Sequence, residues 1–163
     1  MQGECGHKDA QKAQNGNFAP YAPFRGDIFV LCDLVRETAF AIHKFLRYGH
    51  LEKVYENALS HRLRKQGLRV EQQVPIKVHD EDGTVVGEFV ADIFVEGILI
   101  VEVKACKAFA DEHIAQALGY LRATEMEHAL LINFGAPKLQ IKKLIMSRLP
   151  DCERKCPGGF PRS

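Results

Sequence analysis

The sequence predicts an α/β domain in which a mixed central sheet is flanked by helices on both faces. Residues 88–105 are almost wholly apolar and β-branched, broken once at Glu96-Gly97, which is typical of two buried strands joined as a hairpin. Two amphipathic helical patterns precede this hairpin. A strand, a helix and a strand follow over residues 98–134, and a crossover of this kind is right-handed and makes its two strands parallel.

The individual elements follow from apolar spacing and turn residues. From Asp27 to Leu46 apolar residues recur every three or four positions, and a second helical stripe runs from about His50 to Gln66. Gly67 is the expected stop of the second helix. The remaining expected elements are, in chain order, strands over 68–78, 85–95 and 98–104, a helix over 109–124, a strand over 129–134 and a last helix over 138–148.

The composition indicates one domain with polar ends. The chain has 163 residues, of which 46% are hydrophobic and 26% charged, and this is ordinary for a soluble globular protein. We expect a disordered leader over residues 1–24, the domain over residues 25–149 and a flexible tail over residues 150–163. No apolar run approaches the ~20 residues of a membrane helix, and the first residues lack the apolar stretch of a secretory signal. We therefore expect a cytoplasmic protein without membrane contact.

The cysteines and the charge distribution give weaker indications of function. The odd number of scattered cysteines favours reduced thiols and disfavours a small redox or metal-sensing protein. The net charge is only +1, yet residues 71–102 carry eight acidic and one basic side chain between two basic blocks. An acidic centre with basic flanks fits a metal site in phosphate-attracting surroundings, and it also fits an ordinary solvated surface. The same two interpretations apply to the basic side chains Arg62, Arg64, Lys65, Arg69, Lys138, Lys142 and Lys143.

Three charged residues interrupt the apolar hairpin. If its turn centres near Gly97, paired residue numbers sum to about 194, and Asp92 lies opposite Glu102 with Cβ atoms roughly 4.5–5.5 Å apart. Lys104 points to the same face as Glu102. Two ionised carboxylates about 5 Å apart repel by roughly 3 kcal/mol at an effective dielectric constant near 20, and a divalent cation between them removes that penalty. The hairpin therefore predicts a metal site with a lysine beside it.

An ordinary ion pair or a strand end explains any one of these three charges equally well. It explains all three in cross-strand register less well, because charged side chains are almost never fully buried without a partner or a metal.

The pattern of motifs resembles a known family. Residues 49–55 read GHLEKVY and fit G-x-x-E-x-x-Y, and residues 116–120 read QALGY. With Asp92 and the run Glu102-Val103-Lys104, these fragments make the chain similar to the GxxExxY family of the PD-(D/E)XK nuclease superfamily, close to its RecB-like members. The resemblance covers roughly residues 33–146, and it implies a restriction-endonuclease-like αβββαβ core.

The resemblance also implies roles for individual residues. Asp92 and Glu102 would bind Mg²⁺ or Mn²⁺ together with the Val103 carbonyl, since hard oxygen ligands favour these cations over zinc. Lys104 would orient or deprotonate the attacking water and stabilise negative charge on the phosphorus centre. Glu52 would help to hold a metal or its water.

The second motif fragment has two interpretations. Gln116 and Tyr120 are four residues apart and share a helix face, from which they would contact a nucleic-acid backbone or support Lys104. Alternatively, Tyr120 packs in the core with its hydroxyl at the rim. Some RecB-like nucleases hold an iron–sulfur cluster through one upstream and three downstream cysteines, but Cys152 and Cys156 supply only two downstream thiols, so no cluster is expected.

The function expected from this set is metal-dependent hydrolysis of phosphodiester bonds, in DNA or, as the less favoured substrate, in RNA. The alternative is a catalytically silent module on the same fold that binds nucleic acid or protein. Lys104 beside both carboxylates argues against the alternative, because a binding module has no need of a buried ammonium group there. A protein partner or a homo-oligomer remains open, since a chain of nearly zero net charge attracts nucleic acid only weakly.

Overall fold

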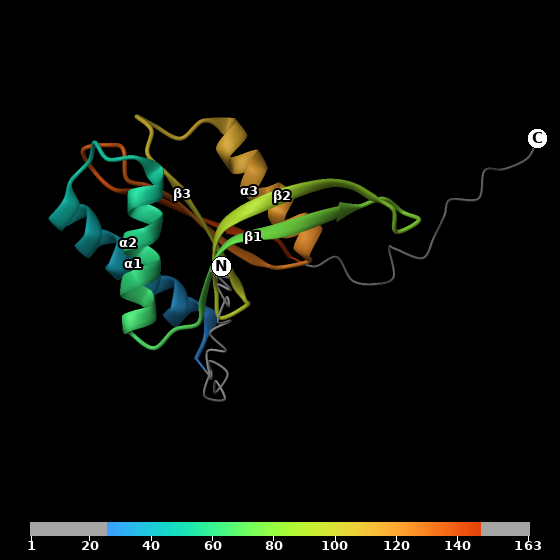
Figure 1. Ribbon diagram of the computed structural model, residues 1–163, viewed down its shortest axis with the longest axis horizontal. Coiled ribbons are helices and arrows are strands. Elements are labelled where there is room, and N and C mark those ends of the chain that lie inside the picture. Colours follow the sequence, from blue (N-terminus) through green and yellow to red (C-terminus); the bar gives the residue numbers. More distant parts are fainter. Residues whose placement is uncertain (1–25, 148–163) are drawn as a thin grey trace, which may run out of the picture.

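A five-stranded sheet lies at the centre of the computed structural model, which describes residues 26–147 (Figure 1). The predicted leader over residues 1–24 and the predicted tail over residues 150–163 lie outside the described residues. No helix in the described part of the chain is both long and apolar enough to cross a membrane. In chain order the elements are α1 (Ile28–Leu46), α2 (Glu52–Lys65), β1 (Val70–His79), β2 (Val85–Val95), β3 (Leu99–Lys104), α3 (Asp111–Thr124), β4 (His128–Asn133) and β5 (Gln140–Ile145).

The sheet is mixed, as predicted. Its strand order is β1-β2-β3-β4-β5, and every neighbouring pair is antiparallel except β3 and β4, which run parallel on either side of the α3 crossover. The distal part of the β1–β2 hairpin projects away from the rest of the domain (Figure 1), and residues 85–90 of β2 are exposed.

Helices cover both faces of the sheet because its strands are apolar on both sides. On one face, residues of β2, β3 and β4 pack with the buried stripes of α1 and α2 in the main hydrophobic core. On the other face, a smaller core gathers around Tyr120 and Leu121 of α3. The hairpin residues that point away from Asp92, Glu102 and Lys104 are fully buried against the α1–α2 side: Ile93, Val95, Val101 and Val103.

The prediction of a last helix over residues 138–148 is wrong. The centre of this segment forms strand β5 instead. Leu139 and Ile141 pack toward α1, whereas Leu144 and Met146 pack toward α3, so the side chains alternate between two faces. Short apolar runs are ambiguous between a period of two and a period of 3.6, and here pairing with β4 decides.

The hairpin register matches the sequence prediction. Ile93 pairs with Val101, Phe94 with Ile100 and Val95 with Leu99. Each pair of numbers sums to 194, so the next position along places Asp92 opposite Glu102.

Candidate active site

Asp92 marks the point where β2 and β3 stop pairing. Backbone pairing of these strands reaches Ile93 and Val101, and the Val103 N–H then donates to the Asp92 Oδ2 at 2.9 Å. The carboxylate thus accepts a bond that a main-chain carbonyl would accept in a continuous ladder. Burial raises the pKa of Asp92, and the Val103 N–H and Lys104 oppose that rise.

Glu102 is the most deeply buried charged group of the site, with 1% of its surface exposed. Its Oε1 accepts a hydrogen bond from the Lys104 Nζ at 2.8 Å, while its Oε2 is buried without a hydrogen-bond partner. Burial and the negative charge of Asp92 raise the pKa of Glu102 to about 7, despite the lysine. A buried oxygen with an unused lone pair is costly unless another donor or a cation completes it.

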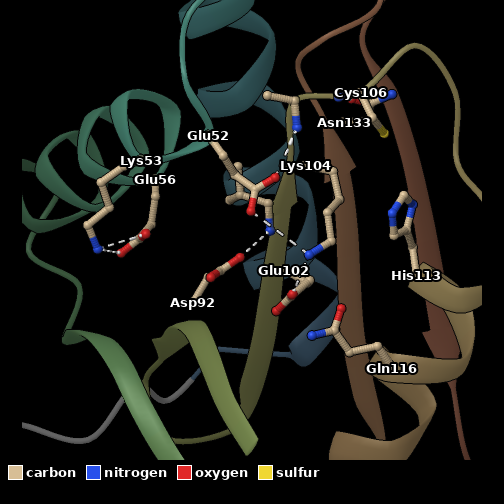
Figure 2. Close-up of polar contacts among 12 residues, drawn as sticks. Glu52, Lys53, Glu56, Asp92, Glu102, Lys104, Cys106, His113, Gln116 and Asn133 are labelled. Carbon is tan, nitrogen blue, oxygen red and sulfur yellow. Dashed lines mark hydrogen bonds and ion pairs between the residues drawn. The ribbon is translucent and has the colours of Figure 1, made fainter.

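Lys104 lies between Glu102 and Glu52, the first residue of α2. Its Nζ lies 2.8 Å from the Glu102 Oε1 and 4.0 Å from the Glu52 Oε1, and its side chain is 13% exposed (Figure 2). Burial would lower the pKa of Lys104, but the hydrogen bond and charge of Glu102 outweigh it, and the pKa is raised. The side chain is therefore an ammonium ion at neutral pH.

The predicted G-x-x-E-x-x-Y fragment positions Glu52. Gly49 makes the turn between α1 and α2 with a φ of 111°, which only glycine adopts easily. Tyr55 is fully buried, donates its hydroxyl to the Arg47 carbonyl at 2.7 Å and stacks on Phe134 with ring centroids 4.7 Å apart. With the turn and the helix fixed in this way, Glu52 at the first position of α2 accepts from the Ala105 N–H at 3.2 Å.

The structure brings Asp92, Glu102, Lys104 and Glu52 to one place, but it does not gather three ligands. Within residues 26–147, no three side chains of His, Cys, Asp or Glu are close enough to share a metal ion. Glu52 approaches the lysine rather than the two carboxylates. A buried and a half-buried carboxylate with one unpartnered oxygen still fit a hard cation, because Mg²⁺ keeps several waters and uses only one or two protein carboxylates.

Two residues beside the site were not found from the sequence. Glu56, one turn after Glu52, is 2% exposed and accepts hydrogen bonds from Lys53, Gln72 and Gln73. Gln73 extends this network to Asp92, whose Oδ1 lies 3.4 Å from the Gln73 amide nitrogen. Gln73 has a φ of 54°, the left-handed region that a non-glycine residue rarely adopts. No sequence signal indicates such a conformation, whereas the spacing of Glu56 from Glu52 would have placed both on one helix face.

A second support lies beyond Lys104, where the chain leaves β3. Asn133, fully buried, accepts hydrogen bonds from the N–H groups of Cys106 and Gly135, both at 3.0 Å. A Cβ atom added at Gly135 would lie 2.3 Å from the Ala105 carbonyl carbon. Only a glycine therefore allows the two backbones to approach closely enough for Asn133 to hold both of them.

Gln116 and Tyr120 have different environments. Tyr120 is 1% exposed, and its hydroxyl donates to the Val90 carbonyl at 3.1 Å and accepts from the Gln116 amide at 2.5 Å. Burial and the nearby Glu102 raise the pKa of Tyr120. Gln116 is half-buried and lies beside Glu102 (Figure 2). The position of Tyr120 favours support of Gln116 over direct contact with a substrate.

The basic side chains do not form one continuous face. Arg64 donates to the Val70 carbonyl, and Arg62 lies over the Phe45 ring. Lys142 and Lys143 lie over rings from different elements, Phe109 and Phe29. Their location on strand β5 instead of a helix also places these two lysines on opposite faces of the sheet.

Comparison with known proteins identifies the family. A search among proteins of curated function found no match. A crystal structure described as that of SSO0001 is 15% identical, with a TM-score of 0.48, and the likeness covers 62% of this chain and 52% of the other. The family model of the PD-(D/E)XK nuclease superfamily matches residues 30–144. This range includes all the helices and strands except the first two residues of α1 and the last residue of β5, and it contains the carboxylate–lysine site. By this match, the chain belongs to the PD-(D/E)XK nuclease superfamily.

Proposed function

We propose that this protein is a metal-dependent nuclease that hydrolyses phosphodiester bonds in DNA, with RNA as the less favoured substrate. Superfamily membership implies a nucleic acid substrate and a divalent metal. The finer assignments to the GxxExxY family, to its RecB-like relatives and to Mg²⁺ or Mn²⁺ rest on the motifs quoted above.

One observation carries the proposal. Half-buried Asp92 and buried Glu102 are adjacent carboxylates whose pKa values are both raised, and one oxygen of Glu102 has no hydrogen-bond partner. Such a pair disfavours its own ionisation and gains stability from a bound cation. In the proposed site, Asp92, Glu102 and the Val103 carbonyl hold Mg²⁺ or Mn²⁺, which supplies Lewis acidity toward the phosphate.

Lys104 has a narrower role in this proposal than in the sequence prediction. A lysine whose pKa is raised above its ordinary value is protonated at neutral pH and does not act as a general base. Its ammonium group instead stabilises negative charge on the phosphorus centre and orients water through hydrogen bonds. Glu52, 4.0 Å from the Nζ, holds the ammonium group in position, and Gln116 faces the substrate from α3.

The test is incubation of the purified chain with labelled single- and double-stranded DNA and RNA, in Mg²⁺, in Mn²⁺ and in chelator. Cleavage is expected with metal and not with chelator. Lys104→Ala should reduce the cleavage rate by about 10²-fold or more, as expected for loss of one charge-stabilising group, while metal binding persists. Lys107→Ala, an exposed lysine three residues further on, is the matched control and should keep full activity.

A second function has one observation in its favour. The described residues contain no cluster of three metal-binding side chains, which suits a catalytically silent module that binds nucleic acid or protein on this fold. Tight binding of a nucleic acid by the wild-type protein, without metal-dependent cleavage of any of the four substrates, would establish this alternative and contradict the nuclease proposal.

A further inference from the structure

One side of α1 carries exposed residues that the carboxylate site does not use. Phe29, Asp33, Arg36 and Phe40 follow one another at intervals of four, three and four residues, so they lie along one face of the helix. Phe29 is 55% and Phe40 is 51% exposed, and the side chains of Asp33 and Arg36 are 63% and 50% exposed. These four residues, here called the α1 stripe, extend over roughly 16 Å of helix.

The α1 stripe borders a groove of about 580 Å³ between α1 and strand β5. The other wall of this groove is formed by Leu139, just before the edge strand, and by the alternate β5 residues Ile141, Lys143 and Ile145. Ile145 is 56% exposed, and the Lys143 Nζ lies 3.9 Å from the centroid of the Phe29 ring. Two phenylalanines and an isoleucine exposed around one hollow form an apolar patch of the kind that marks a protein interface.

Two copies of the α1 stripe that run in opposite directions present complementary side chains to each other. The numbers 29 and 40 have the same sum as 33 and 36, so all four residues are symmetric about the middle of the stripe. Two copies of α1 packed antiparallel about a two-fold axis through that middle would place Asp33 of each copy against Arg36 of the other. The same packing would place Phe29 of each copy against Phe40 of the other.

This self-complementarity indicates that the partner at the groove is a second copy of the same chain. In a two-fold interface one patch must match itself, both in shape and in charge. The stripe satisfies this with one acid and one base between two aromatic rings, whereas a patch for an unrelated partner has no reason to be symmetric. Within one chain Asp33 already pairs with Arg36 at 2.9 Å, but exposed pairs of this kind contribute little to stability. Across the two-fold axis, each charge would gain a second partner in a site shielded from water by the phenylalanines.

We propose that the α1 stripe and the adjoining groove form the interface of a homodimer with antiparallel α1 helices. The proposal does not depend on nuclease activity, because none of these residues belongs to the carboxylate–lysine site.

Charge exchange tests the interface. The mass of the full-length chain is measured by light scattering over a range of micromolar concentrations, with twice the 18.3 kDa of one chain expected at the upper end. Asp33→Arg alone and Arg36→Asp alone should each give single chains, because each places four like charges together at the axis. The double variant Asp33→Arg/Arg36→Asp should restore the dimer. An equal mixture of the two single variants should form mixed dimers, since one then supplies only bases and the other only acids.

Aromatic variants provide the matched control. Phe40→Glu should give single chains, whereas Phe45→Glu should leave the dimer unchanged, because Phe45 is 76% exposed on α1 but lies outside the stripe, over Arg62. Thermal unfolding of each variant shows that it is folded, and all of the substituted positions are exposed. A wild-type protein that remains a single chain at every concentration would overturn the proposal. So would a dimer that survives Asp33→Arg, or a double variant that fails to restore it.

Discussion

Glu102 and Lys104 form one ion pair, yet their environments act on the two groups differently. The hydrogen bond and charge of Glu102 raise the pKa of Lys104, whereas burial and the charge of Asp92 raise the pKa of Glu102 to about 7. A cation that binds this site must therefore displace a proton from Glu102, and metal binding and proton release are coupled.

Metal binding should be visible as stabilisation. Mn²⁺ or Mg²⁺ at about 100 times its dissociation constant should stabilise the folded protein by about 2.7 kcal/mol and raise the melting temperature. Asp92→Asn should abolish this shift while the protein stays folded, since the amide oxygen still accepts from the Val103 N–H. Glu88→Gln, on the exposed part of the same strand, is the control and should keep the shift. An equal metal response in wild type and Asp92→Asn would remove Asp92 from the site.

The pH dependence of stability in chelator should also reveal Glu102. Its pKa is about 7 in the folded protein and near its ordinary value of 4.5 in the unfolded chain, so between these two values the folded state binds more protons. The free energy of unfolding should therefore fall as pH rises from about 4.5 to about 7. Glu102→Gln removes this component, and the difference between variant and wild type in urea unfolding should grow over that interval. Two parallel curves would show that Glu102 is not buried as described.

At the scale of single residues, the sequence predicted the charges on the hairpin but not those that support them. Asp92, Glu102 and Lys104 were found because a period of two and a tight turn determine a register. Glu56 could have been found from its helix spacing to Glu52, but Gln73 could not, because its hydrogen bond crosses from β1 to α2 and depends on a left-handed backbone. Such a contact between distant segments leaves no periodic signal.

At the scale of elements, helices and strands were predictable where the sequence fits either a helical or a strand pattern but not both. The stripes of α1 and α2 and the apolar, β-branched run of the hairpin are long enough to be unambiguous. Strand β5 is six residues long and carries two adjacent lysines, so only its pairing with β4 separates it from a helix. The close approach of Gly135 to the end of β3 is likewise a property of two segments together and not of either sequence.

The close contact between Gly135 and the end of β3 can be tested by substituting two glycines. Gly135→Ala should destabilise the protein by ~1–3 kcal/mol, because the new methyl group would overlap the Ala105 carbonyl carbon and force the backbone after Lys104 to move. Gly87→Ala should be nearly neutral, since a Cβ there meets no atom within 4 Å. Denaturant unfolding of both variants provides the comparison. If both substitutions cost the same, the close packing at Gly135 is not required for stability.

At the scale of the whole molecule, the two hydrophobic cores hold the sheet between its helices. Charge distribution along the sequence was a poor guide at this scale, because the basic residues separate onto different faces once the chain folds. The burial of the hairpin, in contrast, followed directly from its almost wholly apolar sequence.

Val101 provides the test of that core. Val101→Asp places an unpaired carboxylate among fully buried side chains and should cost more than about 4 kcal/mol, enough to unfold the domain or most of it. Val86→Asp makes the same exchange at a position that is 62% exposed and should change stability by less than about 0.5 kcal/mol. Circular dichroism melting curves compare the two. A folded Val101→Asp variant of normal stability would contradict the described orientation of β3.

The hydrogen bond from the Val103 N–H to Asp92 gives the aspartate a structural role that does not depend on catalysis. A lineage of this fold that lost its enzymatic role would still be under selection to keep an acceptor at that position, since the hairpin opens there and the N–H must be satisfied. Lys104 donates to a side chain, the Glu102 carboxylate, so its loss leaves no main-chain group without a partner. Loss of activity during evolution should therefore erase the lysine first and leave the aspartate behind, so among relatives of this chain the lysine is the better mark of a working enzyme.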